Sequence, residues 1–438
     1  MAKYAFINGY VLSGCSDMKP EKKMVLTEGD RIREIREPGE VPAGYEAVDL
    51  EGKYIMPGLI NMHVHLPGGG KPQKKQRDNT KLAATLMGNP FTRAIAYRMC
   101  AGYAKTELMS GVTTLRTVGG LADFDTRLRD SIRAGKQVGP RIIAADQGIS
   151  VPHGHMAGSV AVIATSVKEV VDYVDKVAGE NVDLIKLMIT GGVLDAKAKG
   201  VPGELKMPPE MVKAACDEAH KKGFYVAAHV ESTEGVRVAL QNGVDSIEHG
   251  AKPDQEIIDL FHSRHAFLCT TLSPALPYAF FDRSISHASE VEQYNGRMVF
   301  DGIRDCAVSA LQNNIPIALG NDVGCPYITH YDFWRELVYF HLFVGVSNQQ
   351  ALHTATLGNA ELAGLGKETG SIEAGKAADL IVTEANPLED LTALRSVRMV
   401  MAGGTLHRHP QFRRNPEIDK QLDPFLKPET AAKALQNS

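Results

Sequence analysis

The sequence has little that would place it in a membrane or on nucleic acid. No apolar run approaches the roughly 18 residues that a membrane-spanning helix needs, so no membrane partner is expected. The opening residues, Met1 to Tyr10, lack the long apolar core of a signal peptide, which predicts a cytoplasmic location. The formal net charge is −4, whereas phosphate binding needs a basic surface, so we expect no nucleic-acid partner.

Cysteine is sparse, and no two cysteines form a Cys-x-x-Cys pair. A disulfide framework is typical of short secreted chains with closely spaced cysteines, and this chain has 6 in 438 residues. We therefore expect reduced thiols that pack as small hydrophobic side chains. Their positions are Cys15, Cys100, Cys216, Cys269, Cys306 and Cys325.

The first and last parts of the chain have sequence patterns typical of short β-strands. Residues 3–56 alternate strand-like runs with turns, and Asn8-Gly9 predicts a hairpin between its flanking strands. Strand-like sequence patterns appear again after residue 365. We predict that residues 1–56 and 366–408 form one discontinuous β-sandwich domain, with the rest of the fold inserted between them. Residues 409–438 are polar and partly helical by propensity, and are expected to wrap the surface as a C-terminal extension.

Between these segments, apolar strand candidates alternate with amphipathic helical stretches. Eight such strands joined by helices predict parallel βα units and an α/β fold of the (β/α)8 TIM-barrel type over residues 57–365. An open doubly wound sheet is the alternative, but no Gly-x-Gly-x-x-Gly turn follows the first strand. The strand candidates are 59–65, 112–118, 141–145, 182–189, 224–229, 244–248, 267–272 and 315–320, and the clearest helical stretches are 93–110, 167–178, 208–222 and 254–264.

Polar residues stand where several of these strands end. His63 and His65 end the first strand, and because side chains alternate along a strand, both point to the same side. Active sites of such barrels lie at the carboxyl ends of the strands, and imidazole is the commonest metal ligand in proteins. Six potential ligands should converge on the barrel axis: His63, His65, Lys186, His229, His249 and Asp322.

Lys186 is the unexpected member of this set, because it lies inside an apolar strand. Burying an ammonium group is costly unless its charge is removed or paired. One interpretation is a buried salt bridge to Asp322 or Glu248. The other is a lysine carbamylated by carbon dioxide, which becomes an anionic oxygen ligand able to bridge two cations. A protonated lysine has no lone pair for a metal.

These motifs resemble the amidohydrolase superfamily, and within it the prolidase- or carboxypeptidase-like group that includes dipeptidases and ochratoxin-hydrolysing enzymes. The resemblance covers residues 4–406. It is carried by Pro57-Gly58-Leu59-Ile60 leading into His63-Val64-His65, Ile185-Lys186-Leu187-Met188, Thr190-Gly191-Gly192-Val193, Ala228-His229, Ser246-Ile247-Glu248-His249-Gly250, Leu319-Gly320-Asn321-Asp322, Thr354-Ala355-Thr356, Asn359-Ala360, and the run from Gly370 to Leu380.

The resemblance implies an enzyme with two divalent metal ions, most often zinc. His63, His65 and Asp322 would bind the first ion, His229 and His249 the second, and carbamylated Lys186 would bridge them together with a hydroxide. The expected reaction is hydrolysis of an amide (C–N) bond in a dipeptide, N-acyl amino acid or similar small molecule. In that reaction Asp322 would move the proton from the attacking hydroxide to the leaving amine. A homo-oligomer is expected.

Substrate contacts are expected from residues around this centre. His155, in the loop after the third strand, could hydrogen-bond the scissile carbonyl or a substrate carboxylate, and His153 is a second candidate there. Arg237 stands where the related carboxypeptidases hold a substrate carboxylate, a task that suits its forked guanidinium. Those relatives tend to have tyrosine where this chain has Glu231, which puts strict carboxypeptidase specificity in doubt. The loop 67–92 could close as a lid.

Two other functions are compatible with the same fold. A mononuclear deaminase or an imidazolonepropionase-like cyclic amide hydrolase would not need a bridging lysine, so Lys186 argues against this alternative. A non-catalytic assembly protein on the same scaffold would be expected to have lost some ligands, whereas all six are present.

Overall fold

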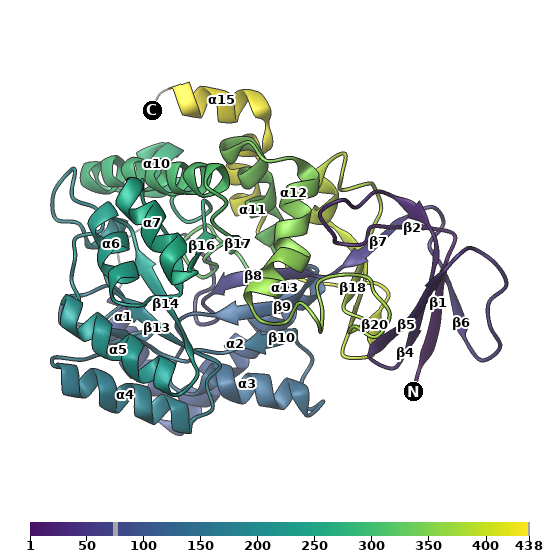
Figure 1. Cartoon of the computed structure of the whole chain (residues 1–438), viewed down its shortest axis with the longest axis horizontal. Helices are drawn as coiled ribbons and strands as arrows, with labels where there is room; N and C mark the ends of the chain where they lie inside the picture. Colours follow the sequence, from purple (N-terminus) through teal and green to yellow (C-terminus); the bar gives the residue numbers. More distant parts are fainter. Residues whose placement is uncertain (73–77, 437–438) are drawn as a thin grey trace.

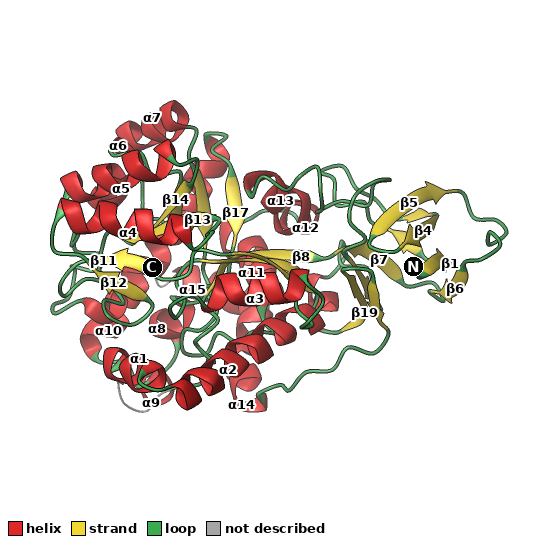
Figure 2. Ribbon diagram, turned by 90° about the horizontal axis from the view of Figure 1, so that it is seen from below, coloured by secondary structure: helices red, strands yellow, loops and turns green. Residues whose placement is uncertain are grey.

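Two regions that differ in secondary-structure content make up the structure. In the computed structural model, which describes residues 1–72 and 78–436, a body of strands surrounded by helices lies beside a region built of strands alone (Figure 1). The first and last strands of the chain meet in that second region, while the barrel-like body is formed by the sequence between them (Figures 1 and 2).

The strands of the body are parallel. A three-stranded sheet has the order β10-β9-β8, and a seven-stranded sheet has the order β12-β11-β13-β14-β15-β16-β17. The strands are β8 (Leu59–Val64), β9 (Val112–Thr117), β10 (Arg141–Ile143), β11 (Gly148–Ser150), β12 (Ala161–Ile163), β13 (Leu184–Met188), β14 (Tyr225–Val230), β15 (Ser246–His249), β16 (Phe267–Thr270) and β17 (Ile317–Leu319). Each of the eight predicted strands overlaps one of them.

The two parallel sheets meet at both edges. On one side Val64 forms a parallel bridge with Val323, and the amide of Asp322 donates to the carbonyl of His63 at 3.0 Å. On the other side the amide of Asp183 donates to the carbonyl of Ala144 at 2.7 Å. A closed ring of parallel strands is consistent with a (β/α)8 barrel.

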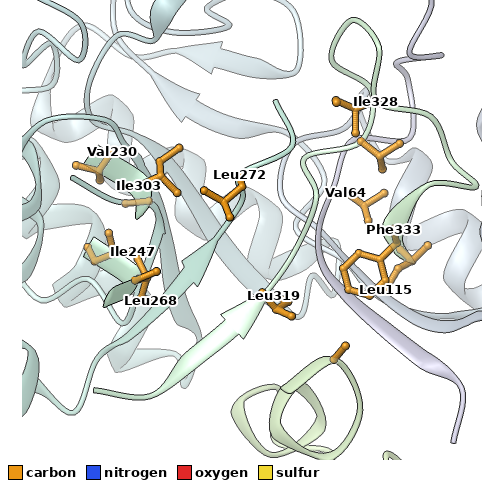
Figure 3. Close-up of a cluster of buried hydrophobic side chains, with 14 of the residues drawn as sticks. Val64, Leu115, Val230, Ile247, Leu268, Leu272, Ile303, Leu319, Ile328 and Phe333 are labelled. Carbon is orange, nitrogen blue, oxygen red and sulfur yellow. The ribbon is translucent and has the colours of Figure 1, made fainter. Parts of the chain in front are cut away.

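Helices cover the outside of the ring, and apolar side chains fill the space between the two layers. The predicted helical stretches appear as α2 (Pro90–Met109), α4 (Val167–Gly179), α5 (Pro209–Lys221) and α7 (Gln255–Arg264). Helix α5 buries Met211, Val212, Ala215, Cys216 and Ala219, one face of a helix of period 3.6. Figure 3 shows the side chains of Val64, Leu115, Val230, Ile247 and Leu268, all buried.

Several helices were missed by the sequence analysis. Helix α10 (Glu290–Gln312) is the longest of them. It starts with a capping box in which Ser289 accepts from the amide of Glu292 while the Glu292 side chain accepts from the amide of Ser289. That Ser-x-x-Glu pattern was readable. Helices α3 (Phe124–Arg133) and α6 (Thr233–Gln241) were also missed.

The stretch expected as a lid is only partly described. Residues 73–77 lie outside the described residues, and helix α1 (Asn79–Met87) follows them. Within the part of the chain that the structure describes, no helix combines the length and apolar character needed to cross a bilayer.

Strands from both ends of the chain build the second region. One sheet has the order β5-β4-β1-β6, and the other has the order β20-β19-β18-β7-β2-β3. Buried side chains of both sheets, such as Phe6, Val25, Ile55, Leu380 and Met401, share one hydrophobic cluster. The domain limits at 1–56 and 366–408, and the β-sandwich assignment, stay predictions. The strands are β1 (Lys3–Ile7), β2 (Tyr10–Val11), β3 (Glu21–Lys22), β4 (Met24–Glu28), β5 (Arg31–Arg36), β6 (Glu46–Asp49), β7 (Tyr54–Pro57), β18 (Leu380–Thr383), β19 (Val397–Ala402) and β20 (Thr405–His407).

The hairpin predicted at Asn8-Gly9 is wrong. Strand β1 pairs with β4 and β6, whereas β2 pairs with β3 and β7 in the other sheet. Asn8 does adopt the left-handed conformation that favours a turn (φ +56°), but its side chain donates to Asp49 at 2.9 Å. A Cβ atom on Gly9 would lie 2.5 Å from the Leu50 side chain, so glycine allows the chain to cross between the sheets.

The C-terminal residues pack on the helical body. Helices α14 (Pro416–Leu422) and α15 (Pro428–Gln436) follow the last strand, and the buried Arg335 of α11 (Phe333–Tyr339) donates to Asp419 at 3.1 Å and to Asp423 at 2.7 Å. These charge-assisted hydrogen bonds tie the extension to the body.

The seam between β8 and β17 yields a stability prediction. The buried Asn359 side chain donates to the carbonyls of Ile60 and Leu319 at 2.7 and 2.9 Å, and accepts from the amide of Leu319 at 2.9 Å. Asn359→Leu should lower the free energy of unfolding by about 3 kcal/mol, because buried backbone groups lose their partners. Chemical denaturation would measure this loss. Exposed Asn79→Leu is the control, and equal stability of the two variants would contradict the assigned role.

Candidate metal centre

Four histidine rings form a continuous cluster at the carboxyl ends of β8, β14 and β15. The ring centroids of His63 and His65 are 5.3 Å apart, those of His63 and His249 are 4.9 Å apart, and those of His249 and His229 are 4.6 Å apart. Three of the rings are fully buried, and His65 is partly exposed. The parallel strands therefore bring all four predicted histidines to one place.

Two strand-end residues have an unusual backbone conformation. His249 has φ +70° and Asp322 has φ +51°, values in the left-handed region that non-glycine residues rarely adopt. In a regular strand, Glu248 and His249 would point to opposite faces. The turn of the backbone at His249 lets both side chains reach the ring of His63. Such strained conformations are common at functional sites.

Asp322 lies against the two histidines of β8. Its Oδ1 is 3.5 Å from Nε2 of His63 and 3.3 Å from Nε2 of His65. Burial alone would raise the pKa of this carboxyl group, but the adjacent imidazoles outweigh burial and lower it. Potential ligand atoms of His63, His249 and Asp322 all lie within 4.8 Å of one another, so an ionised carboxylate and two imidazoles share one space.

Lys186 projects from β13 into the same region without a partner. The residue is 1% exposed, and its Nζ has no hydrogen-bond partner among the described residues. Burial lowers the pKa of this amine to about 8. The predicted alternative of a salt bridge to Asp322 or Glu248 is wrong for the described structure, because the Glu248 carboxylate pairs with Arg116 and His63 instead.

Glu248 and Arg116 form a buried network that the sequence analysis did not predict as part of the site. Glu248 accepts from Arg116 at 2.7 Å and contacts Nδ1 of His63 at 2.7 Å. Arg116 also donates to the carbonyl of Met62 at 2.7 Å. A carboxylate on Nδ1 orients a histidine and leaves Nε2 for a metal. The readable signal was a glutamate and an arginine inside two strands whose residues are all buried.

The other histidines are oriented by similar contacts. Nδ1 of His65 is 2.8 Å from the carbonyl of Gly119, and Nδ1 of His249 is 2.6 Å from the hydroxyl of Thr271. Each therefore has Nε2 available toward the cluster. Burial lowers the pKa of His63 and His229, and lowers that of His249 to about 4. These rings are neutral near pH 7, which is the form that binds metal.

His155 joins the cluster from the loop after β11. Its ring stacks on that of His229, with centroids 4.0 Å apart and planes 3° from parallel. Its Nδ1 is 2.6 Å from Oδ2 of Asp195, a residue that the sequence analysis missed. Asp195 also accepts from the amide of Gly192 at 2.8 Å, so the loop after β13 holds the imidazole in place.

Glu231 lies at the edge of the cluster. One of its carboxylate oxygens and the ring nitrogens of His229 and His249 lie within 4.8 Å of one another. Burial, followed by repulsion from Asp322 and Asp195, raises the pKa of Glu231 to about 8. The structure therefore brings Glu231 to the predicted centre.

The structure does not bring Arg237 or His153 to the centre. Arg237 lies on α6, and its guanidinium pairs with Glu234, with Asp254 and, at 2.9 Å, with Glu256. These three acids occupy its donors, so the structure places Arg237 away from the centre, and its role in holding a substrate carboxylate stays a prediction. His153 is exposed, with φ +60° in its loop. No described contact joins it to the cluster.

Two of the cysteines adjoin the centre, and all six are free thiols, as expected. Ligand atoms of Cys269, His63 and Glu248 lie within 4.8 Å of one another, and Sγ of Cys325 is 3.5 Å from Asp322. Burial raises the pKa of both thiols, which favours their neutral form.

The buried pair of Arg116 and Glu248 predicts a large stability effect. Arg116→Met should destabilise the protein by about 3–5 kcal/mol, because it leaves Glu248 as an uncompensated buried charge. The double variant Arg116→Met/Glu248→Leu should recover part of that loss in a denaturation experiment. Arg398→Met breaks an exposed pair with Glu384 and serves as the control, with an expected cost below about 1 kcal/mol. Equal costs for the two single variants would contradict the buried-charge argument.

Comparisons with known proteins agree with this geometry. The model of the Amidohydrolase family matches residues 54–406. A solved structure from Bifidobacterium longum that carries a provisional prolidase name has a TM-score of 0.84 at 34% identity, over 97% of this chain and 98% of that one. A Xaa-Pro dipeptidase solved with methionine in its active site has a TM-score of 0.81 at 29% identity, over 93% of this chain and 100% of that one. The ochratoxinase of Aspergillus niger is 26% identical over 405 residues, which are 85% of this chain and 79% of the ochratoxinase. The chain belongs to the amidohydrolase family.

Proposed function

We propose that the chain is a binuclear metal-dependent amidohydrolase that cleaves an amide bond in a dipeptide, an N-acyl amino acid or a similar small molecule. Membership of the amidohydrolase family supports hydrolysis of a C–N bond. Among the similar proteins, the Xaa-Pro dipeptidase is named for a dipeptide substrate, and it resembles this chain over 93% of its length. The observation that carries the proposal is the unpartnered amine of Lys186 within a cluster of histidines.

The residues present fit two metal ions. His63, His65 and Asp322 would hold one ion, and His229 and His249 the other. Imidazole nitrogens and a carboxylate are donors that suit zinc. Lys186 would bridge the ions as a carbamate, because a buried neutral amine can react with carbon dioxide and the resulting anion would need cations beside it. When bound, the ions would lower the pKa of a water molecule and polarise the substrate carbonyl.

The side chains around this centre would position the substrate and move the proton. Asp322, ionised and beside His63 and His65, would accept a proton from the attacking water and deliver it to the leaving amine. His155 is oriented by Asp195 through Nδ1, so its Nε2 is left to hydrogen-bond the substrate carbonyl or a substrate carboxylate. An amide nitrogen is a poor leaving group, so its protonation is a requirement of this reaction.

The two alternatives receive less support. A mononuclear deaminase or imidazolonepropionase-like hydrolase would have no use for a buried amine between the two groups of histidines. A non-catalytic assembly protein would not need to maintain buried imidazoles and an unpartnered lysine, which are costly for folding.

A hydrolysis screen tests the function directly. The purified protein, loaded with zinc, should hydrolyse at least one member of a panel of dipeptides, N-acyl amino acids and aryl amides. Elemental analysis should find close to two zinc ions per chain, and removal of the metal by a chelator should abolish activity reversibly. One metal per chain with full activity would refute the binuclear site. Deamination of a ring substrate without amide hydrolysis would favour the alternative reaction.

Substitution of Lys186 tests whether its carbamate bridges the two metal ions. Lys186→Ala should lower kcat/KM by about a thousandfold or more, because losing the bridging ligand removes several kcal/mol of transition-state stabilisation. Metal content should fall below two ions per chain, and a short carboxylate such as acetate should restore part of the activity. The matched control is Lys213→Ala, an exposed lysine of α5 that pairs with Asp217. Full activity with two metal ions in the Lys186 variant would exclude the bridging role.

A further inference from the structure

Glu231 is a carboxylate without a visible counter-charge at the edge of the proposed centre. It follows directly after β14, where its backbone amide donates to the Thr190 hydroxyl at 3.0 Å. Its Oε2 is buried and has no hydrogen-bond partner within the described residues. Buried polar atoms are normally paired, so an oxygen of this kind indicates a missing partner.

The space in front of this oxygen is shared with His155. A Cβ atom built on Gly192 would lie 3.4 Å from Oε2 of Glu231 and 3.1 Å from Cε1 of His155. The two side chains therefore approach the same stretch of backbone, and a side chain at position 192 would crowd both of them. On its other side, Glu231 faces His229 and His249. The carboxylate thus adjoins both the histidine cluster and His155, the imidazole proposed to contact the substrate carbonyl.

The charges around Glu231 favour a cation as the missing partner. Within residues 1–72 and 78–436, no lysine or arginine forms an ion pair with Glu231. Its charged neighbours include two further acids, Asp322 and Asp195. Lys206, in the segment between β13 and α5, pairs with Glu204. A half-buried carboxylate among acids is stabilised in its ionised form by a positive group beside it.

We propose that Glu231 binds the free α-ammonium group of the substrate, so that the enzyme prefers dipeptides and other aminoacyl amides to N-acyl amino acids. This inference rests on the proposed amidase function and narrows its substrate class. In a dipeptide, the α-nitrogen is bonded to the carbon next to the scissile carbonyl. A carbonyl held beside the metal ligands and His155 therefore places the ammonium group near the next carboxylate, which is Glu231. An N-acyl amino acid has no charge at that position.

The first test compares two substrates that differ only in the α-ammonium group. An alanyl dipeptide and its propionyl counterpart, in which hydrogen replaces that group, share the same carbon skeleton and the same leaving amino acid, which should be the best one found in the screen. The zinc-loaded wild-type enzyme should hydrolyse the alanyl substrate with a kcat/KM about 10- to 100-fold higher, the difference expected for one charge-assisted hydrogen bond. Equal values, or a preference for the propionyl substrate, would overturn the inference while leaving the amidase function intact. Hydrolysis of neither substrate class would overturn the proposed function itself.

The second test assigns this preference to Glu231. Glu231→Gln keeps the shape of the side chain but removes its charge, and should reduce the alanyl-to-propionyl ratio of kcat/KM toward one, mainly through KM for the alanyl substrate. Glu234→Gln is the matched control, since this exposed acid on α6 pairs with Arg237 and should leave the ratio unchanged. If the alanyl-to-propionyl ratio of kcat/KM in the Glu231 variant equals that of the wild-type enzyme, Glu231 does not bind the ammonium group.

Metal analysis of the same variant separates substrate binding from metal binding. Because Glu231 lies within reach of His229 and His249, its oxygen could instead hold a cation there. If Glu231 binds the substrate, the Gln variant should retain the zinc content and zinc affinity of the wild-type protein. Loss of one zinc ion would identify Glu231 as a metal ligand and overturn the inference.

Discussion

The cost of removing charge from water shapes the centre of this protein. Lys186, Glu248, Arg116 and Asp322 all lie on or near the axis of the strand ring, where each would be destabilising alone. Arg116 and Glu248 neutralise each other, and the imidazoles beside Asp322 keep that carboxylate ionised. Lys186 alone lacks a compensating partner. Lys186 is thus the one group of the four whose burial would have to be compensated by carbamylation and bound cations.

The backbone reinforces this arrangement. The strands supply rigid positions, but a regular strand would separate Glu248 from His249. The left-handed conformations at His249 and Asp322 bring additional side chains to the same axis. Contacts to Gly119 and Thr271 then select which nitrogen of each histidine faces the centre. Rigid strands, two local distortions and orienting hydrogen bonds together restrict the geometry of the donors before any ligand arrives.

Much of this architecture was predictable because apolar strands and polar strand ends leave clear patterns in a sequence. The potential ligands stood out as histidines, a lysine and an aspartate at the ends of, or within, apolar runs. Interactions between distant segments were less readable. The roles of Arg116 and Asp195 depend on contacts with residues from other strands and loops. The contacts of Arg237 were not readable either, because its spacing from His229 does not reveal that α6 directs its side chain toward acids of α7 and the preceding turn. The Asn8-Gly9 pattern likewise predicts a turn, but not which sheet receives the next strand.

The seam between the first and last strands has a consequence for biosynthesis. Asp322 is attached at this seam, since its amide donates to the carbonyl of His63 and the neighbouring Val323 bridges to Val64. The two halves of the first proposed ligand set therefore come from distant parts of the chain. During synthesis, the histidines of β8 emerge from the ribosome long before Asp322, which faces them, is made. Until β17 docks, the emerging chain can expose imidazoles but cannot assemble this ligand set. A metal ion that binds before that step would bind to an incomplete site.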